Sequence, residues 1–254
     1  MIELKNLSYK YGEKYALKDI NLTLNKGEKI VILGVNGSGK STLLKVINGL
    51  IFPDTGEYFY KGRKITKKAF RDKNFAKNFR KEVVLLFQNP DSMLFNPTVY
   101  DEIAFGLRQL GIEGKDRIKN WAERLRIDHL LSRSPFDLSG GEKQKVCLAS
   151  LLILEPEVLL LDEPTANLDP ASTDWLVEFL SGLDKTIITT THNLYTAGYL
   201  GKRAVVLDKD HKVLYDGDMK SLFSDKDLLK RANLMHRHFI GYYRKGEGYG
   251  RKAC

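Results

Sequence analysis

The sequence predicts an α/β protein with a mainly parallel core sheet, an N-terminal antiparallel β subdomain and a helical insertion. Three observations lead to this prediction. Apolar strand-like segments alternate with helix-like segments along much of the chain, which is typical of a parallel sheet. One buried strand, residues 29–33, leads directly into a glycine-rich loop and then into helix-forming sequence at 40–50. Between residues 91 and 137, apolar residues recur at helical spacing instead.

The segment before the glycine-rich loop is β-rich. Short alternating or apolar runs at 2–7 and 20–24 are separated by Gly12 and Gly27, residues that favour turns. The later elements follow in order: a hairpin at 56–62, a basic amphipathic stretch at 67–80, and buried strands at 83–87, 158–161, 186–189 and 204–207.

The helical insertion and the C-terminal tail set the domain boundaries. Ile103 and Leu107 are spaced as on one helix face, as are Ile118 and Trp121. We expect one domain over residues 1–225, which contains a helical subdomain at about 91–150. A tail at 226–254 is expected to begin as helix and to be poorly ordered in its Gly/Tyr/Arg-rich last part.

The bulk composition is that of a soluble protein with a full-sized core. Of 254 residues, 43% are hydrophobic and 29% are charged. The longest apolar stretch, 146–154, is about half a membrane span. The N-terminus is strand-like and lacks the pattern of a signal peptide, so we expect the protein inside the cell. Cys147 and Cys254 have no evident partner, so neither a disulfide framework nor a zinc site is predicted.

The net charge of +9 admits a nucleic-acid or anionic-membrane partner. Basic and acidic residues interleave through most of the chain, and no long uninterrupted basic block occurs. This pattern favours a generally basic background over a dedicated charged surface.

The glycine-rich loop fits the phosphate-binding pattern G-x-x-x-x-G-K-[ST] of P-loop NTPases. Its glycines let backbone N–H groups turn inward around an anion, and the following helix N-terminus adds positive potential. Lys40 is expected to reach the β- and γ-phosphates, and Ser41 to ligate Mg²⁺. No clear guanine-reading N-K-x-D motif is present, which favours ATP. The expected nucleotide-binding residues in this loop are Gly34, Asn36, Gly37, Ser38, Gly39, Lys40, Ser41 and Thr42.

Strand ends supply further polar groups. The apolar strand 158–161 leads into Asp162 and Glu163, at the edge where a parallel sheet binds ligands. Adjacent residues on an extended chain point in opposite directions, so Asp162 is assigned to Mg²⁺ and Glu163 to the attacking water. Gln88 and His192 follow two other strands. Gln88 is expected to ligate Mg²⁺ or orient water, and His192 to bond the γ-phosphate, although each singly fits an ordinary loop residue.

In this order, the segments resemble the ATP-binding subunits of ABC transporters over about residues 2–218, which implies the ABC ATPase fold. Residues 138–142, Leu-Ser-Gly-Gly-Glu, look like the family signature, in which a Ser-Gly-Gly turn opens a helix. The other matches are the phosphate loop at 34–42, Gln88 as the Q-loop glutamine, Asp162 and Glu163 as the Walker B pair, 166–169 as the D-loop, His192 as the switch histidine, and Tyr11 as the aromatic that stacks on adenine.

The resemblance implies a head-to-tail dimer with two ATP molecules at its interface. Ser139, Gly140 and Gly141 of one copy would contact the nucleotide that the opposite copy holds. The implied catalytic residues are Glu163 as base and His192 as γ-phosphate sensor, with Gln88 and Lys40. The implied Mg²⁺ ligands are Ser41, Gln88 and Asp162.

The segment 87–106 looks like the ATPases of energy-coupling-factor importers, which include the cobalt and nickel group. That subgroup typically has Asn-Pro-Asp-x-Gln-Leu-Phe after the Q-loop glutamine, and Met93 stands here where Gln is expected. Met93, Leu94 and Phe95 are expected to form an exposed apolar trio that receives a helix from a membrane partner. The alternative is that they pack inside the helical lobe.

The subgroup implies an ATPase at the cytoplasmic face of the membrane that powers uptake of a metal ion or vitamin. Its partners would be a second ATPase copy or paralogue, a transmembrane coupling protein and a substrate-binding membrane component. The alternatives are an ATPase of another ABC importer or exporter, or a non-transport ABC ATPase acting on nucleic acid. The last would usually carry a coiled-coil insertion or a second ATPase domain, so no nucleic-acid partner is expected. His236 and His238 in the tail are too few to hold a transition metal.

Overall fold

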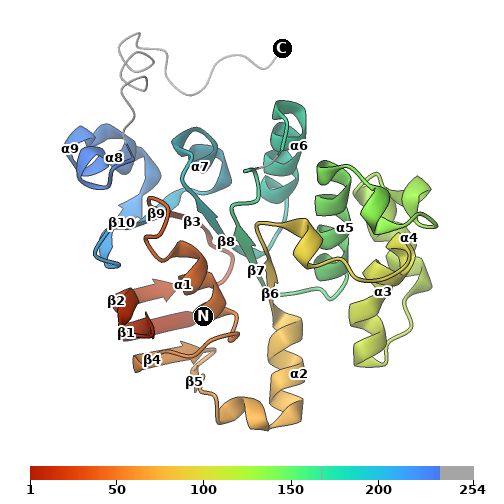
Figure 1. The fold of residues 1–254 in the computed structure, drawn as a ribbon, viewed down its shortest axis with the longest axis horizontal. Coiled ribbons are helices and arrows are strands. Elements are labelled where there is room, and N and C mark those ends of the chain that lie inside the picture. The colour runs from red at the N-terminus through yellow and green to blue at the C-terminus, as the bar shows by residue number, and fades with distance from the viewer. Residues whose placement is uncertain (167, 235–254) are drawn as a thin grey trace.

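The centre of the computed structural model, which describes residues 1–166 and 168–234, is a six-stranded sheet. Five of its strands are parallel, and β10 pairs antiparallel with β9 at one edge. The predicted mainly parallel core is therefore confirmed (Figure 1). In spatial order the strands are β10 (Val213–Asp218), β9 (Arg203–Leu207), β3 (Lys29–Leu33), β8 (Thr186–Thr191), β7 (Val158–Asp162) and β6 (Val83–Leu86).

Both faces of this sheet are covered, as the continuous apolar runs of its strands require. In β3, Ile30 and Ile32 belong to a buried cluster with α1 (Lys40–Ile47) and the antiparallel sheet. Val31 and Leu33 belong to a second cluster on the opposite, helix-covered face. The strand period of two thus assigns alternate residues to two separate cores.

The N-terminal β subdomain is an antiparallel sheet in the order β2-β1-β4-β5. Two of its strands are longer than the predicted runs at 2–7 and 20–24. Register shifts after Leu4, Leu7 and Tyr9 break the alternation in β1, so the sequence pattern marks only part of the strand. The strands are β1 (Ile2–Tyr11), β2 (Lys14–Leu24), β4 (Thr55–Tyr60) and β5 (Arg63–Lys64).

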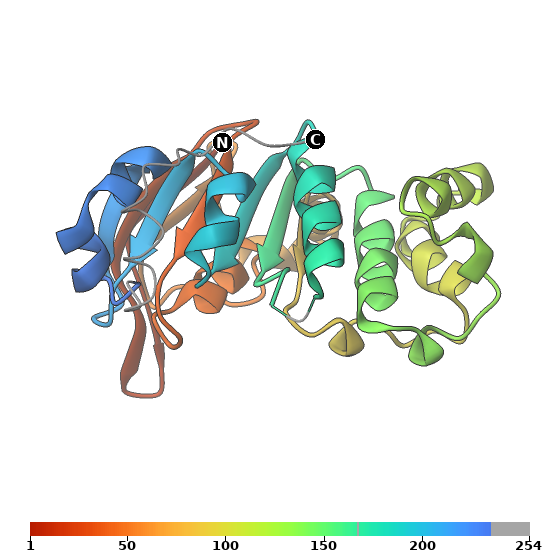
Figure 2. The same cartoon turned by 90° about the horizontal axis from the view of Figure 1, so that it is seen from above.

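The helical insertion is built from α3, α4 and α5, which lie together at one end of the molecule (Figure 2). The predicted apolar positions Ile103, Leu107 and Ile118 are buried there. The helices that follow α1 in the described chain are α2 (Lys73–Glu82), α3 (Val99–Leu110), α4 (Lys115–Arg124), α5 (Gly140–Leu152), α6 (Pro170–Ser181), α7 (Leu194–Leu200), α8 (Met219–Ser224) and α9 (Lys226–Arg231). The chain also forms short 3-10 turns: η1 (Ala69–Arg71), η2 (Pro90–Ser92), η3 (Asp128–Leu130) and η4 (Pro135–Asp137).

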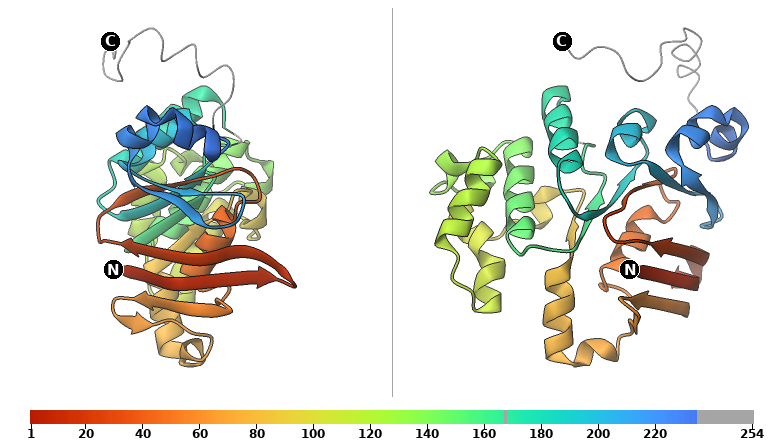
Figure 3. Two further views of the ribbon diagram at one scale, coloured as in Figure 1. Left: turned by 90° about the vertical axis from the view of Figure 1, so that its left-hand side faces the viewer. Right: turned by 180° about the vertical axis from the view of Figure 1, so that it is seen from behind.

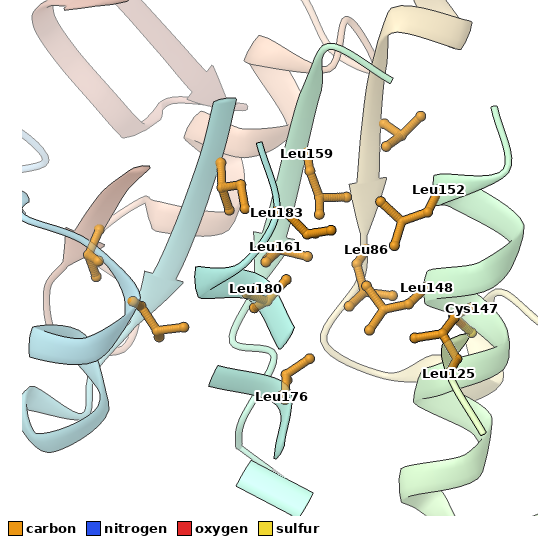
Figure 4. Close-up of a cluster of buried hydrophobic side chains, with 14 of the residues drawn as sticks. Leu86, Leu125, Cys147, Leu148, Leu152, Leu159, Leu161, Leu176, Leu180 and Leu183 are labelled. Atoms are coloured by element: carbon orange, nitrogen blue, oxygen red, sulfur yellow. The ribbon is translucent and has the colours of Figure 1, made fainter. Parts of the chain in front are cut away.

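Helix α5 connects the insertion to the central sheet. Its residues Leu148 and Leu152 pack on the side of Leu86 of β6, while Cys147 lies beside Leu125 of the insertion (Figure 4). Cys147 is a fully buried core residue, as expected, and burial raises the pKa of its thiol to about 12. The apolar run at 146–154 therefore serves the core.

No helix in the described part of the chain is long and apolar enough to cross a membrane. The helical start of the predicted tail is α9, which follows α8 directly. The expectations for His236, His238, Cys254 and the Gly/Tyr/Arg-rich end lie outside the described residues, as does Asn167 of the D-loop segment.

Candidate nucleotide-binding site

The phosphate loop connects the end of β3 to the start of α1, at the edge of the sheet where its parallel strands end. Gly39 is the N-cap of α1 and has φ of 105°, a conformation that favours glycine. A Cβ at Gly39 would also collide with the carbonyl oxygen of Ala16. Because Gly39 has no side chain, the first N–H groups of α1 are not capped and can serve an anion.

Lys40 is buried and folds back over its own loop. Its Nζ donates hydrogen bonds to the carbonyl oxygens of Gly34 at 2.9 Å and Val35 at 3.2 Å. The same Nζ lies 3.5 Å from the carboxylate of Glu163, and both side chains are more than nine-tenths buried. The ammonium therefore sits between the loop and a strand-end carboxylate, and it can reach a phosphate from there.

Asp162 and Ser41 meet through a direct hydrogen bond. The Ser41 hydroxyl donates to Asp162 Oδ1 at 2.9 Å, and the Thr190 hydroxyl donates to the same oxygen at 2.7 Å. The sequence interpretation missed Thr190, because a threonine in a fully buried strand looks like an ordinary β-branched residue. Strand register places Asp162 of β7 opposite Thr190 of β8. Thr190 Oγ1 also accepts from the N–H of Glu163 at 3.0 Å, so it fixes both acidic residues.

The Glu163 side chain points away from that of Asp162, as predicted, but the cause is not the alternation of an extended chain. Its φ is 45°, so the chain is left-handed at Glu163 and is not extended there. This turn directs the Glu163 carboxylate towards Lys40 and His192. The Nδ1 atom of His192 lies 3.0 Å from both carboxylate oxygens. Glu163 is 6% exposed, whereas the His192 side chain is 52% exposed.

The signature segment forms the N-terminus of α5. Ser139 is the N-cap, and a capping box with Glu142 is complete. Glu142 Oε2 accepts from Ser139 N at 2.8 Å and from Ser139 Oγ at 2.6 Å. These hydrogen bonds lower the pKa of the Glu142 carboxyl, with the Ser139 hydroxyl as the largest cause. The helix begins at Gly140, and Ser139 and Gly140 are exposed.

The structure joins only some of the predicted site residues. Within the described residues, hydrogen bonds or ion pairs connect Lys40, Ser41, Asp162, Glu163 and His192, directly or through Thr190. Three groups remain apart from this network in the described part of the chain. Gln88 is exposed just beyond β6, Tyr11 is 52% exposed at the β1–β2 turn, and the third group is Ser139, Gly140 and Gly141 at the start of α5.

The predicted exposed trio at 93–95 is wrong in two of its three members. Leu94 is buried in the helical cluster, and Met93 is half-buried with its Sδ accepting the N–H of Phe87 at 3.4 Å. Only Phe95 is exposed, at 59%, and its ring packs edge-on against Phe105 at 4.8 Å. The chain turns after η2 because the buried Glu102 carboxylate accepts the N–H groups of residues 95 and 96.

These residues fit an Mg²⁺-bound nucleoside triphosphate. The hydroxyl of Ser38 is buried in the phosphate loop without a hydrogen-bond partner in the described chain, as a loop that closes around phosphate allows. Ser41 and Asp162 present two neighbouring oxygen donors, the ligand type that Mg²⁺ prefers, and phosphate oxygens commonly complete such sites. Of the other predicted residues of this loop, Asn36 and Gly37 are exposed, and Thr42 is buried in α1.

The model of the ABC transporter family matches residues 17–166. An ABC transporter ATP-binding protein of Methanosarcina acetivorans is 47% identical over 94% of this chain and 90% of its own length. The energy-coupling factor transporter ATP-binding protein EcfA of Methanocaldococcus jannaschii is 39% identical over 92% of this chain and 85% of its own length.

Solved structures agree with these sequence matches. The structure of CbiO1 from Clostridium perfringens, part of the ABC transporter complex CbiONQ, has a TM-score of 0.77 at 33% identity and covers 96% of this chain and 98% of its own. The ATP-binding cassette MJ0796, as a post-hydrolysis dimer with ADP and Pi, has a TM-score of 0.74 at 31% identity, over 86% and 99% of the two chains. The chain therefore belongs to the ABC transporter family, as an ATP-binding subunit with ATPase activity.

Proposed function

We propose that this protein is the ATP-hydrolysing subunit of an energy-coupling-factor importer, which powers uptake of a metal ion or vitamin through a membrane coupling protein. The observation that carries the ATP-hydrolysing part of this proposal is the network of Lys40, Ser41, Asp162, Glu163 and His192 at the phosphate loop. The likeness to EcfA and to CbiO1 of the CbiONQ complex supports the subgroup.

The network assigns a role to each residue at the ATP phosphates. Lys40 exchanges its loop carbonyls for the β- and γ-phosphates, which separates it from Glu163. Glu163, buried and held through its N–H by Thr190, then orients the attacking water as the catalytic base. His192 is exposed enough to leave Glu163 and bond the γ-phosphate.

Ser41, Gln88 and Asp162 are the proposed ligands of Mg²⁺, which when bound neutralises charge on the phosphates. Tyr11 is proposed to stack on adenine, because its ring is exposed at the end of β1. Ser139, Gly140 and Gly141 are proposed to contact the nucleotide of a second copy or a paralogue. Ser139 and Gly140 are exposed at the start of α5, which suits a phosphate that arrives from another chain. The dimeric state of the MJ0796 cassette supports this arrangement.

A groove between α2 and α3 is the proposed docking site of the coupling protein. It has a volume of about 700 Å³, and α5 contributes Leu151 and Ser150 to its lining. Phe95 and Phe105 line it and are exposed by 59% and 37%, so they offer apolar anchors to an incoming helix. Docking there would hold the subunit peripherally on the cytoplasmic face of the membrane.

The test is co-expression with an energy-coupling-factor coupling protein of the same organism, followed by purification in detergent. We expect the two proteins to co-purify and the coupling protein to raise ATPase activity. Phe95→Ala should weaken co-purification without changing the basal ATPase activity. The control is Phe136→Ala, at a similarly exposed phenylalanine of η4, and it should leave co-purification unchanged. Co-purification with an export permease, or equal loss in both variants, would contradict the proposal.

A further inference from the structure

One short segment of this chain has a net positive charge as large as that of the whole chain. The whole chain has 41 basic and 32 acidic residues. Residues 61–81, which we name the basic segment, contain ten basic residues and one acidic residue, Asp72. The other 233 residues therefore contain 31 of each sign, and their net charge is zero. The interpretation of the +9 charge as an interleaved background therefore fails for this segment, in which a single acidic residue lies among ten basic ones.

The basic segment folds as one surface. It runs through β5, η1 and α2, with Ile65, Ala76 and Phe79 turned into the core. Lys61 and Lys64 pair with acidic neighbours, and Arg63 lies 3.8 Å from Asp72. Seven other basic side chains make no ion pair within the described residues: Lys67, Lys68, Arg71, Lys73, Lys77, Arg80 and Lys81.

The position of the segment adds apolar groups to this charge. In Figures 1 and 3, η1 and α2 form the lower end of the molecule, beside the insertion. Lys73 and Arg80 line the same groove as Phe95 and Phe105. Unpaired cations beside exposed aromatic rings are the chemistry of surfaces that bind at a charged membrane interface.

We propose that the basic segment binds the headgroups of anionic lipids, next to the groove that receives the coupling protein. This inference rests on the proposed function, which puts the groove against a membrane protein. Nucleic acid would also satisfy the charge, but the proposed function places the neighbouring groove, with the exposed Phe95 and Phe105, against a membrane protein. The surface next to such a membrane protein is the bilayer, whose anionic headgroups meet the cations of the basic segment.

The test uses the purified full-length chain and sedimentation with vesicles, without any membrane partner. The probes are phosphatidylcholine vesicles with and without about 30% phosphatidylglycerol. The test variant is Lys67→Glu with Lys68→Glu, in the exposed turn before η1, and the matched control is Lys220→Glu with Lys226→Glu, exposed on α8 and α9. Both change the net charge equally, and none of the four residues belongs to the ATP site.

We expect the wild type to bind only the anionic vesicles and to dissociate at about 0.5 M salt, where the screening length falls to about 4 Å. The test variant should bind about 30-fold or more weakly, because each basic residue near the surface contributes about one kcal/mol. The control should bind like the wild type, and all three should keep equal basal ATPase activity.

Three outcomes would overturn the inference: equal binding to neutral vesicles, equal loss in the control, or tighter binding to a DNA duplex than to anionic vesicles at the same salt. Failure of the proposed function is a separate result, namely no co-purification of the wild type with the coupling protein in detergent. If the inference alone fails, the test variant still co-purifies with the coupling protein, which still raises its ATPase activity as in the wild type.

Discussion

The side-chain amide of Gln144 donates a hydrogen bond to the backbone carbonyl oxygen of Pro164, at 2.5 Å between buried residues. Gln144 is on α5, the helix that Ser139 caps, and Pro164 directly follows Glu163. One bond therefore ties the signature helix to the loop that aims the proposed catalytic base. In a head-to-tail dimer these two groups serve different ATP sites, so the bond connects the two sites within one chain.

Gln144→Leu should separate these elements with little change in volume. The Pro164 carbonyl would then be buried without a donor, which costs about 1–3 kcal/mol of unfolding free energy. If the bond positions Glu163, kcat should fall about tenfold while the KM for ATP stays nearly constant. Steady-state kinetics and urea unfolding measure the two effects. Asn120→Leu, at an exposed amide on α4, is the control. If Gln144→Leu lost stability but kept its kcat, the bond would stabilise the fold without positioning Glu163.

Glu163→Gln keeps the shape of the side chain but removes the base. We expect kcat to fall by about 10²–10⁴-fold while ATP still binds, because water activation is lost and the phosphate contacts remain. Turnover and ATP-dependent dimer formation on a sizing column are the measurements. Glu178→Gln, an exposed glutamate of α6, should behave like the wild type. Near-normal turnover in Glu163→Gln would rule out its role as catalytic base.

Mixing two inactive chains tests the shared site. Lys40→Ala removes the phosphate contact of one copy, and Ser139→Arg blocks the signature turn of the other. Each homodimer should be inactive, while the mixed dimer keeps one site free of both substitutions. Recovered ATPase activity in the mixture, above that of either variant alone, is the expected result. If both substitutions act on one site of the same chain, mixing recovers nothing.

The capping box at α5 should depend on pH. Because Ser139 lowers the folded-state pKa of Glu142, the ionised carboxylate stabilises the fold above its unfolded pKa of about 4.3. That contribution is lost as the pH falls through the lower folded value. The difference in urea midpoint between wild type and Glu142→Gln should therefore be present at neutral pH and vanish in acid. A difference that is constant across this range would contradict the role of the charge.

Gly39→Ala should destabilise the fold by about 2 kcal/mol or more, since φ is 105° and a Cβ would meet the Ala16 carbonyl. Gly140→Ala is the matched control, because a Cβ there has open space and the position is helical. Thermal or urea unfolding of both variants gives the comparison. Equal stability of the two would mean that the phosphate loop relaxes freely at Gly39.

Sequence reasoning was strongest where a short segment determines its own geometry. The strand, loop and helix around Lys40 follow from glycine spacing and apolar pattern, and the structure confirms the fold they imply. It was weaker in β1, because bulges interrupt the alternation. It misjudged Leu94, since only the turn held by Glu102 decides which of two neighbouring apolar residues is buried.

By itself the sequence determined the parallel sheet, the phosphate loop and the family, because those signals lie in contiguous residues. It also contained the concentration of basic residues at 61–81, which is a matter of counting. Only the tertiary structure decided that Thr190 holds both acidic residues and that Gln144 reaches Pro164. These contacts join residues about 20–30 positions apart, so their partners depend on strand register and helix packing, which no local pattern encodes.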